Sequence, residues 1–161
     1  MKSLFCVLLL ASAIFLSSCA NKDYADDVKC ANIIASVEEI LPDTQEYEVF
    51  GEEHIKYNFE NARAQDDACI LYSADSTDIN EIGIFHAPSE GLVASLAEDV
   101  ENYLQNMRTD QRAFIESYAP NEISKLDGSR IYVFGNYVVY TILPTNERDA
   151  AIEEIEGLLL K

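Results

Sequence analysis

Cys19 is the residue of this sequence whose surroundings most clearly predict a chemical role. It stands at the end of an apolar run of 13 residues, Leu4 to Leu16, and Lys2 precedes that run. The run is too short to cross a bilayer as a helix, which takes about 20 residues. A positive start followed by such a run is typical of a secretory signal. A cysteine thiol at its end can form a thioether to diacylglycerol, and small residues before it admit a processing protease.

The residues that end the signal resemble the lipobox of bacterial lipoproteins; they are Leu16, Ser17, Ser18 and Cys19. We expect residues 1–18 to be a lipoprotein signal peptide, residues 19–27 to hold the lipidated cysteine and a short tether, and residues 28–161 to form one globular domain. Two acyl chains, such as palmitate, hold a protein stably on a membrane. The predicted location is the extracytoplasmic face of the cell membrane. The alternative is an ordinary signal peptide with an incidental cysteine.

Two cysteines remain in the predicted mature chain, Cys30 and Cys69. Outside the cytoplasm such a pair can form a disulfide, but spacing alone does not establish one. Cys30 also shares a helical stripe with Ile34, Val37 and Leu41, which suits a core thiol equally well. Both interpretations stay open, whereas the sequence has neither a C-x-x-C pair nor a helical histidine pair for a metal.

The remaining polar clusters have simpler interpretations than catalysis. His54 follows Glu52 and Glu53, but nothing at a ligand spacing completes a metal or acid–base site, so a solvated polar loop is expected. His86 is expected to be a structural histidine. The oxygen-rich loop lacks the glycine of a calcium loop and is interpreted as a turn; it holds Asp75, Asp78, Asn80 and Glu81.

No pattern in the sequence indicates an activated nucleophile, a phosphate-binding loop or a cofactor. The chain carries 29 acidic and 11 basic residues, a net charge of −18. Binding to nucleic acid needs clustered lysine and arginine, so a nucleic-acid partner is excluded. Apolar content of 48% indicates a folded domain.

Hydrophobic periodicity predicts the elements that hold these residues. Helical patterns cover residues 24–41, 89–119 with a bend near Thr109, and 145–160. Strand patterns form two hairpins, residues 69–72 with 81–86 and residues 130–134 with 137–143. The acidic stretch 38–67 has no sustained period and is expected to be irregular, with short strand or helix pieces.

These elements predict an α+β domain of order α-ββ-α-ββ-α. We expect an antiparallel four-stranded sheet, made of the two hairpins, with helices packed on one face. The strand over residues 137–143 is apolar on both faces and is therefore placed centrally. If the other face of the sheet is open, aromatic rings could form a binding platform there; they are Tyr132, Phe134, Tyr137 and Tyr140. Core and cross-strand packing is the alternative use of these rings.

Four segments form a recognisable succession: "DINEIGIF", "LAEDVENYLQ", "FIESYAPNEISKL" and "GNYVVYTI". They resemble a family of small lipoproteins found mainly in Gram-positive anaerobes. The family is defined by a domain of unknown function, number four-three-five-eight, and the resemblance covers about residues 57 to 160. It implies a bacterial envelope lipoprotein and no particular activity.

The expected function is that of a membrane-anchored extracytoplasmic binding or accessory module without catalysis. Its partners are the membrane, through a diacylglycerol anchor on Cys19, and an envelope protein or glycan ligand. The alternative is a hydrolase that acts on envelope glycans or peptides through carboxylates. That function predicts a cleft with a carboxyl group of raised pKa.

Overall fold

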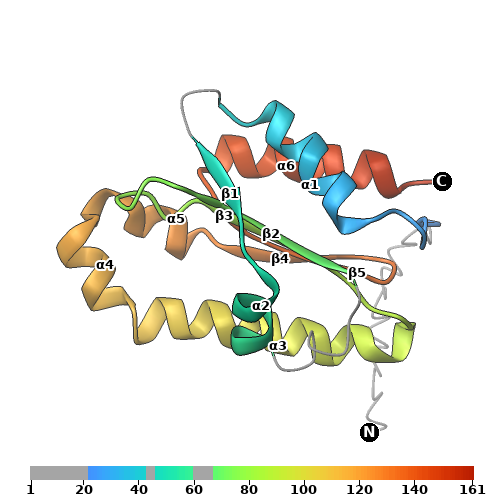
Figure 1. Ribbon diagram of the computed structural model, residues 1–161, viewed down its shortest axis with the longest axis horizontal. Helices are drawn as coiled ribbons and strands as arrows, with labels where there is room; N and C mark the ends of the chain where they lie inside the picture. Colours follow the sequence, from blue (N-terminus) through green and yellow to red (C-terminus); the bar gives the residue numbers. More distant parts are fainter. Residues whose placement is uncertain (1–21, 43–45, 60–66) are drawn as a thin grey trace, which may run out of the picture.

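A computed structural model describes residues 22–42, 46–59 and 67–161 of the chain (Figure 1). The elements follow in the order α1 (Cys30–Ile40), β1 (Tyr47–Val49), α2 (Glu52–Asn58), β2 (Ala68–Ser73), β3 (Glu81–His86), α3 (Glu90–Thr109), α4 (Arg112–Tyr118), the 3-10 helix η2 (Pro120–Glu122), α5 (Ile123–Asp127), β4 (Arg130–Phe134), β5 (Tyr137–Ile142) and α6 (Thr145–Leu159). The α+β class and both predicted hairpins are confirmed. Among the described residues, no helix has both the length and the apolar character needed to cross a bilayer.

The sheet has five antiparallel strands in the order β1-β2-β3-β5-β4. All six residues of β5 are buried, and this strand lies between β3 and β4, as its apolar pattern predicts. The prediction of a four-stranded sheet is wrong, because the sheet has one more strand. The additional strand, β1, comes from the acidic stretch and has only three residues, too few for a period-two pattern to stand out.

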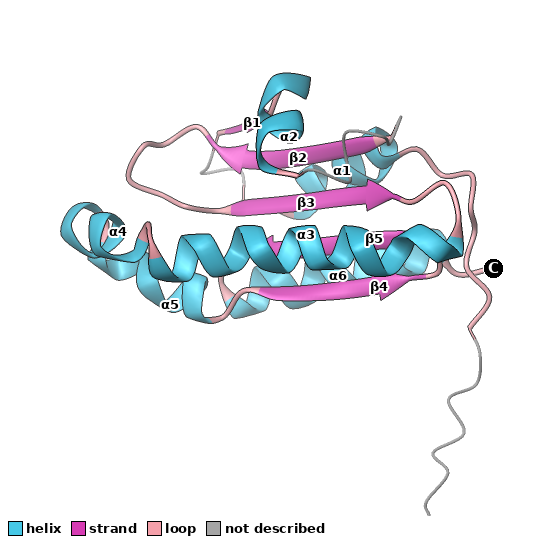
Figure 2. Ribbon diagram, turned by 90° about the horizontal axis from the view of Figure 1, so that it is seen from below, coloured by secondary structure: helices cyan, strands magenta, loops and turns pink. Residues whose placement is uncertain are grey.

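Helices cover both faces of the sheet, which corrects the expectation of helices on one face (Figures 1 and 2). α1 and α6 pack on one face and contribute buried residues such as Ile33 and Ile155. α3 packs on the other face through Leu96, Val100 and Leu104. The central strands are apolar on both sides, so each side needs its own cover.

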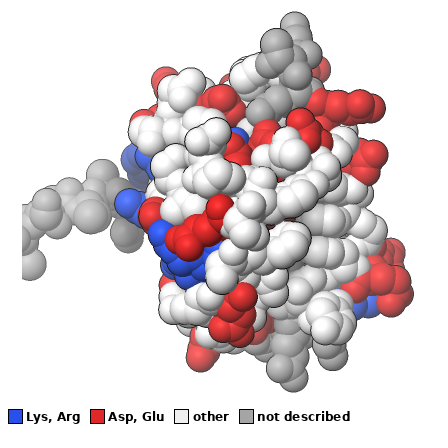
Figure 3. Space-filling view, turned by 90° about the vertical axis from the view of Figure 1, so that its left-hand side faces the viewer, with Lys and Arg blue, Asp and Glu red and all other residues white. Residues whose placement is uncertain are grey.

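The predicted long helix is broken where the bend was expected. α3 ends at Thr109 and α4 begins at Arg112. The Thr109 hydroxyl donates to the Gln105 carbonyl at 2.9 Å, and such a bond favours bending of a helix. The break places α4 and α5 at the end of the molecule away from the chain's C-terminus. Figure 3 views that end, where acidic side chains are spread over the surface with basic side chains next to some of them.

The start of the described chain is attached to its end. Tyr24 forms an isolated antiparallel bridge with Leu160, and the Ala25 amide donates to the Leu159 carbonyl at 2.7 Å. Tyr24 Oη also donates to Glu156 at 2.8 Å. Contacts with the domain therefore begin before residue 28, and part of the predicted tether 19–27 packs on α6.

Gly83 is required for the close packing of β3 on β5. It pairs in register with Tyr140, whose ring lies across it. A Cβ atom at position 83 would lie 2.1 Å from Tyr140 Cε1. The ring thus occupies the space that any larger residue would need.

We expect Gly83→Ala to destabilise the protein by about 3 kcal/mol, because a buried ring must move to admit the methyl group. Gly157→Ala is the matched control. Gly157 lies in α6 with no neighbour within 4 Å of the added Cβ, so it should stabilise by about 0.5 kcal/mol. Urea unfolding of both variants measures the difference. Equal stability of the two variants would contradict this account of Gly83.

Candidate functional site

Glu81 is a carboxyl group buried in the core under α3. It begins β3, and its side chain points to the same face of the sheet as Gly83 and Phe85, since alternate residues of a strand share a face. Only 7% of the residue is exposed. A buried charge is costly unless it is paired or hydrogen-bonded. The hydrogen-bond partners of Glu81 therefore determine how much its burial costs the folded state.

Two tyrosine hydroxyls satisfy Glu81. Tyr103, on α3, donates to Oε1 at 2.9 Å and lies 3.2 Å from Oε2. Tyr140, on β5, also donates to Oε1. Burial raises the pKa of Glu81 from 4.5 to about 7, and the two hydrogen bonds oppose part of that rise. The carboxyl group is therefore protonated in part near neutral pH.

Aromatic rings enclose this carboxyl group. The ring of Phe59, at the end of α2, lies 4.8 Å from those of Phe85 and Tyr103, centroid to centroid. The Tyr103 and Tyr140 rings are 5.6 Å apart, edge to face. Phe59 is fully buried, so it fixes the end of α2 against the sheet and α3.

A groove lies on the outer side of Tyr103, between α2 and α3. Its volume is about 420 Å³, and it is lined by Tyr57, Asn58, Asn102, Tyr103, Asn106 and Gln111. We call this the α2–α3 groove. Its volume is within the range of ligand-binding pockets, and its lining consists of carboxamides and phenols. Tyr103 belongs both to the groove and to the Glu81 hydrogen-bond network.

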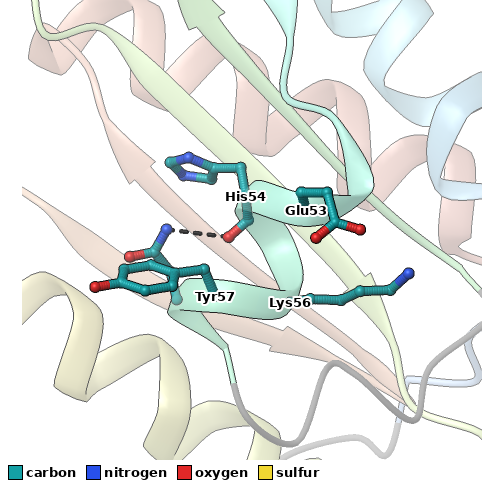
Figure 4. A pocket seen from close by; sticks show the side chains of 5 residues that line it. Glu53, His54, Lys56 and Tyr57 are labelled. Carbon is teal, nitrogen blue, oxygen red and sulfur yellow. Dashed lines mark hydrogen bonds between the residues drawn. The ribbon is translucent and has the colours of Figure 1, made fainter.

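A second, more open hollow adjoins α2 and has a volume of about 810 Å³ (Figure 4). Figure 4 shows Glu53 and Lys56 extending to one side of the helix and His54 and Tyr57 to the other. Lys56 pairs with Glu52 at 2.8 Å. The charged side chains of this hollow therefore do not converge on one point.

His54 is not in an acid–base pair with its acidic neighbours. Its ring stacks on Phe50 at 3.6 Å between centroids, and burial lowers its pKa. The expected solvated loop is wrong, because residues 52–58 form helix α2. His86 contacts Asp26 at 2.8 Å and stacks on Tyr137, which confirms its structural role.

The oxygen-rich loop between β2 and β3 is held by hydrogen bonds and an ion pair. Asp75 accepts from the amide and the hydroxyl of Thr77, both at 2.8 Å. Lys125 bonds Asp78 at 2.8 Å and Glu122 at 2.5 Å. Within the described ranges, no group of three or more acidic, histidine or cysteine side chains is suited to hold a metal. A turn fixed to α5 explains the loop.

The predicted aromatic platform does not form. Tyr137 and Tyr140 are fully buried and lie in opposite cores. Phe134 is also buried, and Tyr132 packs beside it against the core under α1 and α6. The reason is that α1 and α6 cover the face that was expected to be open. These rings serve packing, the alternative that the sequence left open.

The other predicted site residues are cysteines. Cys30 and Cys69 are free, buried thiols in the core under α1 and α6, which favours the core-thiol interpretation over the disulfide. Burial raises the pKa of both thiols. Cys19 and the other lipobox residues lie outside the described residues.

Sequence reasoning missed the α2–α3 groove because its lining comes from three separate segments. Asn102 and Asn106 are four residues apart on α3 and so share one face of the helix. The sequence could therefore have indicated a polar helical face with two carboxamides. It gave no indication that Tyr57 and Asn58 lie opposite them.

The family model described as domain of unknown function (DUF4358) matches residues 41–143, and the chain belongs to this family. The match begins earlier than the resemblance noted in the sequence, so most of the acidic stretch, with β1 and α2, is part of the family region. It includes every residue that lines the α2–α3 groove, together with Glu81 and Tyr140. No curated protein and no solved structure matches the chain.

The raised pKa of Glu81 predicts an unusual dependence of stability on pH. A carboxyl group whose pKa is higher in the folded state than in the unfolded state stabilises the folded state. This stabilisation is complete when the pH is below the pKa of the unfolded state. That stabilisation is lost as the pH rises from 4.5 to about 7. The loss amounts to about 3 kcal/mol.

We expect Glu81→Gln to remove this loss, because glutamine does not titrate. Between pH 4.5 and pH 7.5 the unfolding free energy of the wild type should fall relative to that of the variant. Urea unfolding at several pH values measures it. Glu153→Gln, at an exposed position of α6, is the control and should follow the wild type. A constant difference between Glu81→Gln and wild type would show that Glu81 does not titrate in this range.

Proposed function

We propose that this member of the family is a membrane-anchored extracytoplasmic lipoprotein. Its globular domain acts as a non-catalytic binding module of the bacterial cell envelope, and the α2–α3 groove is its ligand site. The lipobox at Leu16–Cys19, combined with the attachment of residues 22–25 to the C-terminal helix, is the observation that carries the proposal.

The attachment makes the tether between anchor and domain short. Only three steps of the chain separate Cys19 from Lys22, at most about 11 Å when fully extended. Lys22 pairs with Glu156 at 2.5 Å, and Tyr24 bonds the same carboxylate. A lipid on Cys19 would therefore hold the end of the domain that carries Leu160 close to the bilayer.

The groove lies away from that end along α3. Glu90, at the start of α3, lines a hollow with Tyr24 and Asn136, which places the beginning of the helix at the anchored end. Asn102 and Asn106 follow 12 and 16 residues later, so they lie about 18 and 24 Å farther along the helix. An anchored domain would thus present the groove beyond the membrane surface.

A hydrolase is the second candidate function, because it predicts a carboxyl group of raised pKa. Glu81 has such a pKa, about 7. Its carboxyl group, however, is buried and accepts hydrogen bonds from Tyr103 and Tyr140. Glycosidases use two carboxyl groups flanking the bond that is cut, and the six residues that line the groove include none. The binding module is therefore the function that the geometry favours. Hydrolysis of an oligosaccharide that Glu81→Gln abolishes would favour the hydrolase instead.

We expect Cys19→Ala to release the protein from the membrane fraction of a bacterial host and to abolish labelling with palmitate. Cys6→Ala is the matched control, since Cys6 lies in the predicted signal peptide and should be removed on maturation. Fractionation and labelling of both variants measure the effect. Membrane retention of the Cys19→Ala variant with unchanged labelling would contradict the anchor.

Co-purification from host membranes tests the binding role of the domain. Cross-linked native protein should return a partner or a bound envelope component that the Cys19→Ala variant recovers less efficiently. Recovery of the protein alone in both forms would count against an envelope partner.

A further inference from the structure

We propose that the α2–α3 groove binds a neutral oligosaccharide. This inference rests on the proposed function, because it names the class of ligand that the binding module takes.

The lining of the groove is neutral in a strongly acidic protein. The chain has 29 acidic residues, yet the six lining residues are four carboxamides and two tyrosines. A carboxamide presents both hydrogen-bond donors and an acceptor. A sugar hydroxyl is likewise donor and acceptor at once, so the two groups match without any charge.

Part of this hydrogen-bonding capacity is exposed to water. The side-chain amide of Asn58 donates to the His54 carbonyl at 3.0 Å, and that of Asn106 donates to Asp110 at 3.2 Å. Asn102 and Gln111 lie at exposed positions, where a ligand in the groove can bond their carboxamides in place of water.

Tyr57 supplies an apolar surface at the rim. Its side chain is the most exposed of the large hydrophobic residues described, with 83% of the residue accessible. A ring this exposed buries little apolar area in the folded monomer. The C–H face of a pyranose stacks on such a ring, while the phenol oxygen remains in water.

Other classes of ligand fit the groove less well. An anion would meet the repulsion of a net charge of −18, and a cation would find no carboxylate in the lining. A peptide in extended form is bound chiefly through backbone hydrogen bonds at a strand edge. Here the walls come from the helices α2 and α3, which offer no strand edge.

The groove is also held in a fixed shape. Tyr103 is fixed by its bond to the buried Glu81, and Phe59 packs on its ring. Preformed sites lose less entropy on binding. The floor of the groove is thus part of the core, whereas Tyr57, Asn102 and Gln111 can be changed without entering it.

The test uses the full chain, purified in a detergent without a sugar headgroup and titrated with a panel of neutral oligosaccharides. Chitotetraose, cellotetraose, maltotetraose and mannotetraose are the probes, and isothermal titration calorimetry measures binding. We expect at least one to bind, and the double variant Tyr57→Ala with Asn102→Ala to weaken that binding at least tenfold. Tyr118→Ala is the matched control, because Tyr118 is an exposed tyrosine on α4 outside the groove lining; it should leave binding unchanged.

Each outcome decides the proposal. Binding that the double variant weakens and Tyr118→Ala preserves supports it. Binding to none of the four probes overturns it, as does binding that the double variant leaves unchanged. If no probe binds while a partner still co-purifies from membranes, the proposed binding module stands and only the class of ligand is wrong.

Discussion

The buried carboxyl group of Glu81 is the constraint on which the arrangement around α3 depends. An ionisable group under a helix is tolerated only when its hydrogen bonds are satisfied. Tyr103 reaches it from α3 and Tyr140 from β5, so one carboxyl group joins the helix to two central strands. Its partners also fix the rotation of α3, because Tyr103 must face the sheet. Asn102 and Asn106, on the neighbouring positions of the helix, then face outward and toward α2.

Close packing elsewhere follows from the same network. The Tyr140 ring can lie over β3 only because residue 83 is glycine, and the ring's position brings its hydroxyl to Glu81. Phe59 completes the enclosure from the end of α2. The wall of the groove that α2 provides is thus set by core packing. At the opposite end of α3, the attachment of residues 22–25 to α6 sets how far the groove lies from the proposed anchor.

Sequence patterns predicted the elements with long, strongly apolar runs and failed where the pattern was short or ambiguous. β3, β5 and the break near Thr109 were predictable from periodicity, whereas β1 is only three residues long. The aromatic platform failed for a geometric reason. Tyr137 and Tyr140 are three residues apart on one strand and must face opposite sides of the sheet. The groove was out of reach because periodicity locates a helical face but not the helix opposite it. The sequence places Glu81 both in a polar loop and at the start of the strand 81–86, and only the tertiary structure shows that its carboxyl group is buried.

The most direct measurement is NMR of the full chain, following the side-chain NH₂ signals of asparagine and glutamine during titration with a neutral tetrasaccharide. If the groove is the ligand site, the signals of Asn58, Asn102, Asn106 and Gln111 should shift or broaden together. The NH₂ signal of Asn136, which is bonded to Asp26 at the other end of α3, should stay unchanged. Shifts confined to Asn136, or an unperturbed spectrum at millimolar sugar, would contradict the assignment of the groove as the ligand site.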